Sequence, residues 1–166
     1  MVLIKLKRDT YGAASDYLRK SLEYIYNPNK AKYIGGFGVS IHDAETTQQQ
    51  MEYVKHYFHR TADNPLIHLI VSFPKEVKTL DKAISFARLI AFYFKYEYQI
   101  IWCVHYKPRE KSLFHIHFII NPVSFHDGRL FNSSRENMAD FCEWVNSHTG
   151  LRSLFFFGDS RSSDDL

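Results

Sequence analysis

Two histidines separated by a single residue, within a strongly apolar segment, carry the clearest chemical signal. His115 and His117 alternate with Phe114, Ile116 and Phe118. Alternate side chains share one face of a β-strand, so both imidazoles are expected to point the same way. Burying two imidazoles side by side without partners is costly, and a divalent metal satisfies both because each ring gives it one nitrogen. We therefore interpret this pair as two metal ligands.

A third ligand is expected from the neighbouring strand. His105 ends the preceding apolar segment, Tyr98–His105, which is predicted to be a strand. If this strand pairs with the predicted strand Leu113–Asn121, the end of one approaches the start of the other. That pairing places His105 beside the two histidines and completes three nitrogen ligands.

His68 is the rival for the third position. It lies in Leu66–Phe73, a short apolar run that Pro74 ends and that we predict to be a buried strand. We interpret His68 as a core or substrate-contacting histidine, and we keep it among the candidate DNA-binding residues.

Three neutral imidazoles leave coordination positions open, as a catalytic metal site requires. A metal in such a site, next to a phosphodiester, polarises a non-bridging oxygen and stabilises developing negative charge. Nitrogen ligands suit manganese, zinc, cobalt or nickel, whereas magnesium prefers oxygen, although availability in the cell also decides which ion is loaded. We expect a divalent ion, Mn²⁺ or Mg²⁺, with Zn²⁺, Co²⁺ or Ni²⁺ as alternatives.

Strands and helices are interspersed along the chain, which predicts an α+β sandwich with helices packed on one mainly antiparallel sheet. Ser133 and Glu136 have capping-box spacing, and Gly150 stands where that helix should end. A single domain over residues 1–157 is followed by a polar tail, 158–166. The predicted strands are 2–7, 33–40, 66–73, 98–105 and 113–121, with 151–157 as a further candidate, and the predicted helices are 14–26, 43–59, 80–96 and 133–148.

Composition and charge exclude several classes of protein. The 166 residues fit one domain, and a net charge of +3 is compatible with binding a nucleic-acid backbone without demonstrating it. Cys103 and Cys142 form neither a disulfide framework nor a zinc knuckle. Charge interrupts the N-terminus too early for a signal peptide, and no apolar run is long enough to span a membrane. We expect a cytoplasmic protein.

Three segments of the chain, taken in order, match the pattern of a known family. They are Leu22–Lys30, Val71–Glu76, and Val104-His105 with His115–Asn121. In these segments the chain resembles the relaxases, the mobilisation nucleases of plasmids and conjugative elements, within the superfamily of HUH endonucleases named for a histidine–hydrophobic–histidine motif. The third segment resembles the metal motif of that family, and Asp127–Arg129 is similar to the stretch that comes after the motif.

The resemblance implies a fold and a reaction. The fold is a five-stranded antiparallel sheet with helices on its faces. In the reaction, a tyrosine attacks single-stranded DNA at an origin of transfer, stays attached to the 5′ phosphate and frees a 3′ hydroxyl, and accessory DNA-binding proteins are expected to assist. By position, Tyr24 is the expected nucleophile, Tyr26 is its main rival, and Tyr17 is the third candidate.

The loop after His105 departs from the family pattern. Many relaxases have an acidic residue two places after the first metal histidine, where this chain has Lys107. Basic side chains in this loop are candidates for holding phosphates, as are further residues within or beside the matching segments. The candidate DNA-binding residues are Lys30, His68, Lys107, Arg109, Lys111, Asn121 and Arg129.

Three other functions compete with this interpretation. Rolling-circle replication initiators and single-tyrosine transposases share the metal motif, but they usually place the tyrosine after it, and this chain has no tyrosine beyond Tyr106. A non-catalytic DNA-binding relative would lack a positioned nucleophile. A three-histidine zinc hydrolase of small molecules would need neither DNA nor a tyrosine.

Overall fold

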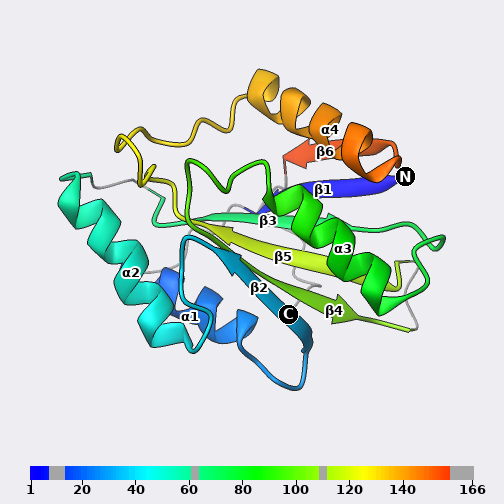
Figure 1. The fold of residues 1–166 in the computed structure, drawn as a ribbon, viewed down its shortest axis with the longest axis horizontal. Coiled ribbons are helices and arrows are strands. Elements are labelled where there is room, and N and C mark those ends of the chain that lie inside the picture. The colour runs from blue at the N-terminus through cyan, green and yellow to red at the C-terminus, as the bar shows by residue number, and fades with distance from the viewer. Residues whose placement is uncertain (8–13, 61–63, 109–111, 158–166) are drawn as a thin grey trace.

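The computed structural model describes residues 1–7, 14–60, 64–108 and 112–157, and within these ranges the chain forms six strands and four helices (Figure 1). The predicted polar tail, 158–166, lies outside the described residues. In chain order the elements are β1 (Val2–Lys7), α1 (Ala14–Ile25), β2 (Ala31–Phe37), α2 (Ala44–Tyr57), β3 (Ile67–Ser72), α3 (Leu80–Ala91), β4 (Ile100–Tyr106), β5 (Phe114–Ile120), α4 (Arg135–Thr149) and β6 (Ser153–Phe157).

One sheet takes strands from both ends of the chain, in the order β2-β4-β5-β3-β1-β6. Its neighbours are antiparallel except β1 and β6, which are parallel. The expected count of five strands is therefore wrong by one, although the α+β class and the mainly antiparallel pairing are confirmed. The sixth strand forms because α4 returns the chain to the edge of β1, where Ser153 hydrogen-bonds through its amide to Asn146 and through its hydroxyl to the carbonyl of Cys142.

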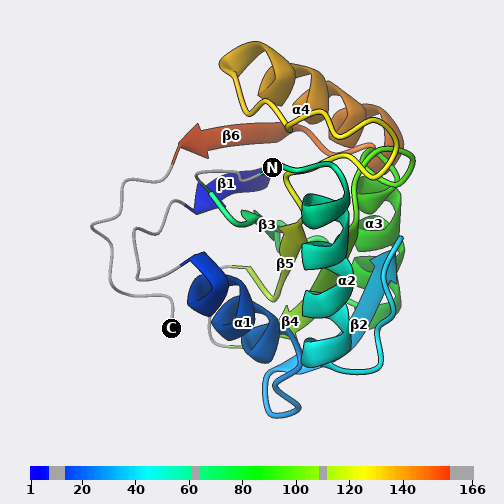
Figure 2. The same ribbon diagram turned by 90° about the vertical axis from the view of Figure 1, so that its left-hand side faces the viewer.

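The two faces of the sheet pack against different helices, and Figure 2 shows α1 and α3 on opposite sides of the central strands. The larger core contains residues of α3 and α4, together with Trp102 and Val104 of β4. A smaller core joins α1 and Met51 of α2 to Ile101 and Cys103 of the same strand. Since side chains alternate along β4, the next residue on the smaller-core face is His105.

Several element boundaries differ from the sequence-based expectation. β2 spans Ala31–Phe37 instead of 33–40, and α2 ends at Tyr57 instead of His59. α3 ends at Ala91 instead of Tyr96, because the subsequent hydrogen bonds tighten to the i−3 pattern, as in Phe94 N to Ala91 O at 3.1 Å. This tightening buries Phe94 in the larger core. The N-cap of α4 is Ser134, whose hydroxyl accepts from the amide of Asn137, and not Ser133.

The end of α4 agrees with expectation. Gly150 ends α4 at φ 68°, a left-handed conformation that glycine adopts without steric cost. Within the described residues, none of the helices has the length and apolar character that crossing a lipid bilayer would take.

Candidate metal centre

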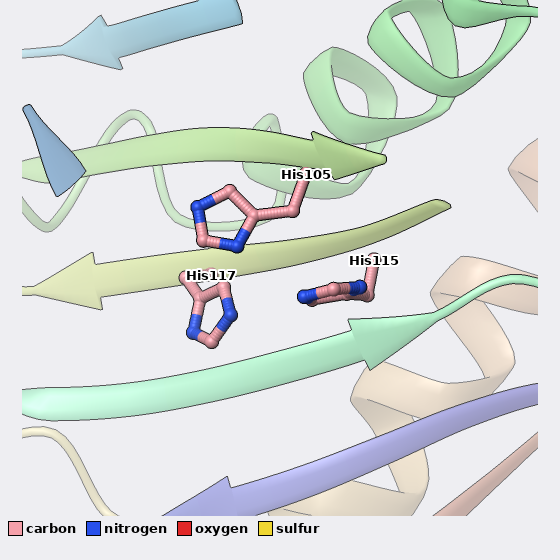
Figure 3. Close-up of side chains that lie close together, drawn as sticks. All are labelled: His105, His115 and His117. Atoms are coloured by element: carbon pink, nitrogen blue, oxygen red, sulfur yellow. The ribbon is translucent and has the colours of Figure 1, made fainter. Parts of the chain in front are cut away.

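The antiparallel pairing of β4 with β5 builds the histidine cluster. His105 stands directly opposite His115 in the register, and Cys103 stands opposite His117. This is the pairing expected from the sequence. Figure 3 shows the three imidazoles lying close together on the same side of the two strands. All three side chains are buried, and each offers a ligand atom within 4.8 Å of the others.

The chemistry of this cluster fits a divalent metal. Ring centroids lie 4.7 Å apart for His105 and His117, and 5.1 Å apart for His105 and His115. His117 Nε2 is buried and has no hydrogen-bond partner among the described residues. Such an atom is costly unless something binds its lone pair. A metal ion held between the three rings would do so.

The electrostatics also favour neutral, ligand-ready imidazoles. Burial lowers the pKa of His105 to about 4, with the neighbouring His115 as the second cause. Burial likewise holds the pKa of His117 well below its usual value, and the nearby histidines add to this. Both rings are therefore neutral near pH 7, which is the protonation state that metal binding requires.

Tyr24 borders the histidine cluster. It lies in the last turn of α1, and its hydroxyl oxygen is 3.5 Å from His105 Nδ1. Its ring meets those of His105 and His117 edge-on, with centroids 5.2 and 5.1 Å away. The turn after α1 returns the chain so that Lys30 Nζ lies 4.7 Å from the centre of the Tyr24 ring. The predicted nucleophile and one predicted DNA-binding residue thus meet at the cluster.

The two rival tyrosines have other observed contacts. The Tyr26 hydroxyl is 2.8 Å from Thr47 Oγ1 in α2, and burial raises the pKa of its phenol. Tyr17 packs against the smaller core. The contact of the Tyr24 hydroxyl with His105 therefore favours Tyr24 over Tyr26, whose hydroxyl contacts Thr47.

His68 does not join the three-histidine cluster, for which it was the rival ligand. It is buried in β3, and its Nε2 lies 2.9 Å from Nδ1 of His117. Burial, followed by the charge of Lys7, lowers the pKa of His68 to about 3. The DNA contact predicted for His68 stays a prediction, and the structure adds a contact with a candidate ligand that the sequence did not suggest.

Two other predicted DNA-binding residues lie at the opposite end of β5. Asn121 directly follows the strand and is fully buried, with its side chain hydrogen-bonded to Met51 O, Gln99 Oε1 and Val123 N. Arg129 is exposed and pairs with Glu97 at 2.9 Å. The structure gives Asn121 a structural role, and DNA contact by either residue remains untested.

The basic loop after β4 is described in part. Lys107 lies near the cluster, since its charge is among the causes that lower the pKa of His105. Arg109 and Lys111 lie outside the described residues.

Sequence reasoning missed two neighbours of the site. Cys103 Sγ is 3.2 Å from His105 Nε2, and its position two residues before that histidine on a strand was the available signal. Lys7 lies opposite His68 in the register of β1 with β3. The alternation of basic and apolar residues along Val2–Lys7 could have placed its lysines on the histidine face if the pairing had been known.

Comparison with known proteins gives one match. The family model described as relaxase, MobA/VirD2-like, nuclease domain matches residues 24–151, a range that begins at Tyr24 and includes all three clustered histidines. No curated protein and no solved structure matches the chain.

Proposed function

Since this chain belongs to the relaxase family, we propose that it is a metal-dependent nuclease that nicks single-stranded DNA at an origin of transfer through a covalent phosphotyrosine. The observation that carries the proposal is the Tyr24 hydroxyl, 3.5 Å from His105 at the border of a buried three-histidine cluster. A phenol beside a candidate metal centre is the arrangement that attack on a metal-bound phosphodiester requires.

In the proposed reaction, the Tyr24 oxygen attacks the phosphorus and loses its proton. The new bond links tyrosine to the 5′ phosphate, the bond from phosphorus to the 3′ oxygen breaks, and that oxygen takes up a proton to leave a 3′ hydroxyl. The reverse attack religates the strand.

The site must make a weak nucleophile effective, because the reference pKa of a phenol is about 10. The ammonium of Lys30, over the Tyr24 ring, favours the phenolate electrostatically. His105, His115 and His117 would hold the divalent ion. When bound, that ion supplies Lewis-acid polarisation of the phosphate and stabilises its developing charge.

The sheet beside the cluster offers a surface for the DNA strand. In the register, His117 is followed across the sheet by Ile70, Lys5 and Phe156, at a strand spacing of about 4.8 Å. Phe156 is 46% exposed, and an aromatic ring can stack on any base. We expect the strand flanking the scissile phosphate to lie along this row, with Lys5 near a phosphate.

The test is adduct formation. The protein is incubated with Mn²⁺ and single-stranded oligonucleotides that include candidate origin sequences, and covalent protein–DNA product is resolved on a denaturing gel. We expect an adduct that chelator and Tyr24→Phe abolish. The matched control Tyr26→Phe should retain it, because that hydroxyl contacts Thr47 and not the histidines. An adduct that persists in Tyr24→Phe would contradict the assignment.

Transfer at an origin also needs the duplex to be opened, because the proposed substrate is single-stranded. We therefore propose accessory DNA-binding proteins as partners. Adding such proteins to supercoiled DNA that carries the origin should raise the nicked fraction without changing nicking of the single-stranded oligonucleotide. If they raise both equally, their role is not duplex opening.

A further inference from the structure

His68 is a buried histidine that the proposed reaction does not use. Its side chain is 5% exposed in β3, between Ile67 and Leu69, and it lies on the same face of the sheet as the histidine cluster. Its Nδ1 is buried and has no hydrogen-bond partner among the described residues. A residue kept only for packing would not need a polar atom left in this state, so the ring calls for a functional explanation.

The hydrogen bond observed for His68 ties it to a candidate ligand. His68 Nε2 and His117 Nδ1 are 2.9 Å apart, and both rings are buried, with centroids 5.2 Å apart. One of these nitrogens must carry the proton and the other must accept it. The direction of this bond decides which nitrogen of His117 keeps a lone pair.

The two directions have opposite consequences. If His117 Nδ1–H donates to His68, the lone pair of His117 is on Nε2, the nitrogen without a hydrogen-bond partner among the described residues. If His68 donates instead, the proton of a neutral His117 sits on Nε2, where it blocks metal binding. Ligand histidines commonly donate their second N–H to an outer partner that fixes tautomer and ring orientation.

We propose that His68 is a positioning residue that accepts the Nδ1–H hydrogen bond of His117 and thereby aims Nε2 of His117 at the metal. The inference rests on the metal site of the proposed function and not on its nuclease reaction. His68 acts from β3, which neighbours the strand of His115 and His117, β5, and β5 in turn neighbours the strand of His105, β4. Three adjacent strands therefore hold the cluster.

Two variants of matched length separate positioning from packing. His68→Gln keeps an oxygen acceptor near the place of Nε2, whereas His68→Met has a similar shape and lacks that acceptor. Mn²⁺ binding is measured by calorimetry on the full chain, without DNA. Losing an outer partner typically costs 10–100-fold in metal affinity. We expect a loss of that size, about 10–100-fold, in His68→Met and a loss of only a few-fold in His68→Gln.

The tautomer of His117 gives a readout that packing alone would not move. In ¹⁵N-detected spectra of the metal-free protein at pH 7, we expect the Nδ1–H tautomer in the wild type and in His68→Gln. In His68→Met we expect this preference to be lost. Thermal unfolding of each variant shows whether it is folded.

Several results would overturn the inference. These are equal losses of affinity in the two variants, unchanged affinity in both, or a wild-type His117 that carries its proton on Nε2. If either variant fails to fold, the wild-type tautomer alone still decides the direction of the bond. Mn²⁺ binding that survives His115→Ala would contradict both the metal site and this inference. Metal binding without a DNA adduct would contradict only the proposed reaction.

Discussion

Polar side chains are buried at both ends of strand β5, but the two ends differ in whether these side chains have hydrogen-bond partners. At its start, the imidazoles of His115 and His117 lie in a cluster in which His117 Nε2 lacks a hydrogen-bond partner within the described residues. Just past its end, the Asn121 amide donates to Met51 O and Gln99 Oε1, and its oxygen accepts from Val123 N. A buried polar group with its hydrogen bonds made specifies structure, whereas the open nitrogen of His117, within a cluster of three possible ligands, is explained by a bound ion.

The largest expected difference between the two ends is in metal binding. His115→Ala removes one of three ligands and should weaken Mn²⁺ binding by more than about 100-fold, beyond the range for an outer partner. Asn121→Ala should leave the affinity within about twofold, because its hydrogen bonds belong to the opposite end of the strand. Calorimetric titration compares the two variants. Similar Mn²⁺ affinities in both would contradict the distinction between a metal-binding end and a structural end of β5.

The next largest expected difference is in the free energy of unfolding, and here the larger effect is expected at the Asn121 end of the strand. Asn121→Ala leaves Met51 O, Gln99 Oε1 and Val123 N without their partner, and should lower the free energy of unfolding by about 3 kcal/mol. His115→Ala, in metal-free protein, should change it by less. Urea unfolding with chelator present measures both. A larger loss from His115→Ala would contradict the assignment of structural and functional ends.

Lowering the pH should destabilise the folded protein through the buried histidines. The pKa of His105 is lowered to about 4 and that of His68 to about 3, below the value of about 6.5 in an unfolded chain. The unfolded chain therefore binds more protons as the pH falls below about 6.5, and stability is lost down to the folded pKa values, at about 1.4 kcal/mol per pH unit for each group.

Two substitutions should distinguish the contribution of His68 to this acid sensitivity from a general loss of stability. In metal-free protein unfolded by urea at pH 7.0, 5.5 and 4.5, His68→Met should show a shallower loss of stability than the wild type. Asn121→Ala should shift the whole profile downward without changing its slope, because an amide does not titrate. An unchanged slope in His68→Met would show that His68 is not neutral in the folded protein.

The smallest expected difference concerns two exposed cations. Each phosphate contact to a single strand contributes about −0.7 to the slope of log affinity against log salt. Lys30→Ala, beside Tyr24, should reduce that slope by about this amount. Arg129→Ala, whose side chain pairs with Glu97 at the other end of β5, should reduce it by less. Filter binding of an oligonucleotide over a salt series tests the order, and the reverse order would support the DNA contact predicted for Arg129.

The histidine cluster was within reach of sequence reasoning because its geometry is local. The period of two puts His115 and His117 on one face, and a short antiparallel connection brings His105 opposite His115. The same logic found the buried strands and the class of the fold. It required only residues in consecutive strands.

The features that sequence reasoning missed depend on pairings between distant segments. The contact of His68 with His117 joins residues 49 positions apart, and β6 pairs with β1 across nearly the whole chain. Asn121 was grouped with the metal motif because it is adjacent in sequence, yet a strand of seven residues carries it to the far end of the sheet. The register of β3 with β5, which no local pattern fixes, decides the contact of His68 with His117.

The most direct test of the proposed reaction is to map the amino acid that carries DNA afterwards. The protein is reacted with a cleavable oligonucleotide and Mn²⁺, trimmed with nuclease and protease, and its nucleotide-modified peptide is sequenced by mass spectrometry. We predict phosphotyrosine at Tyr24, lost when His115 is replaced by alanine. Modification of Tyr26 or of another residue, or modification that survives His115→Ala, would contradict the proposed mechanism.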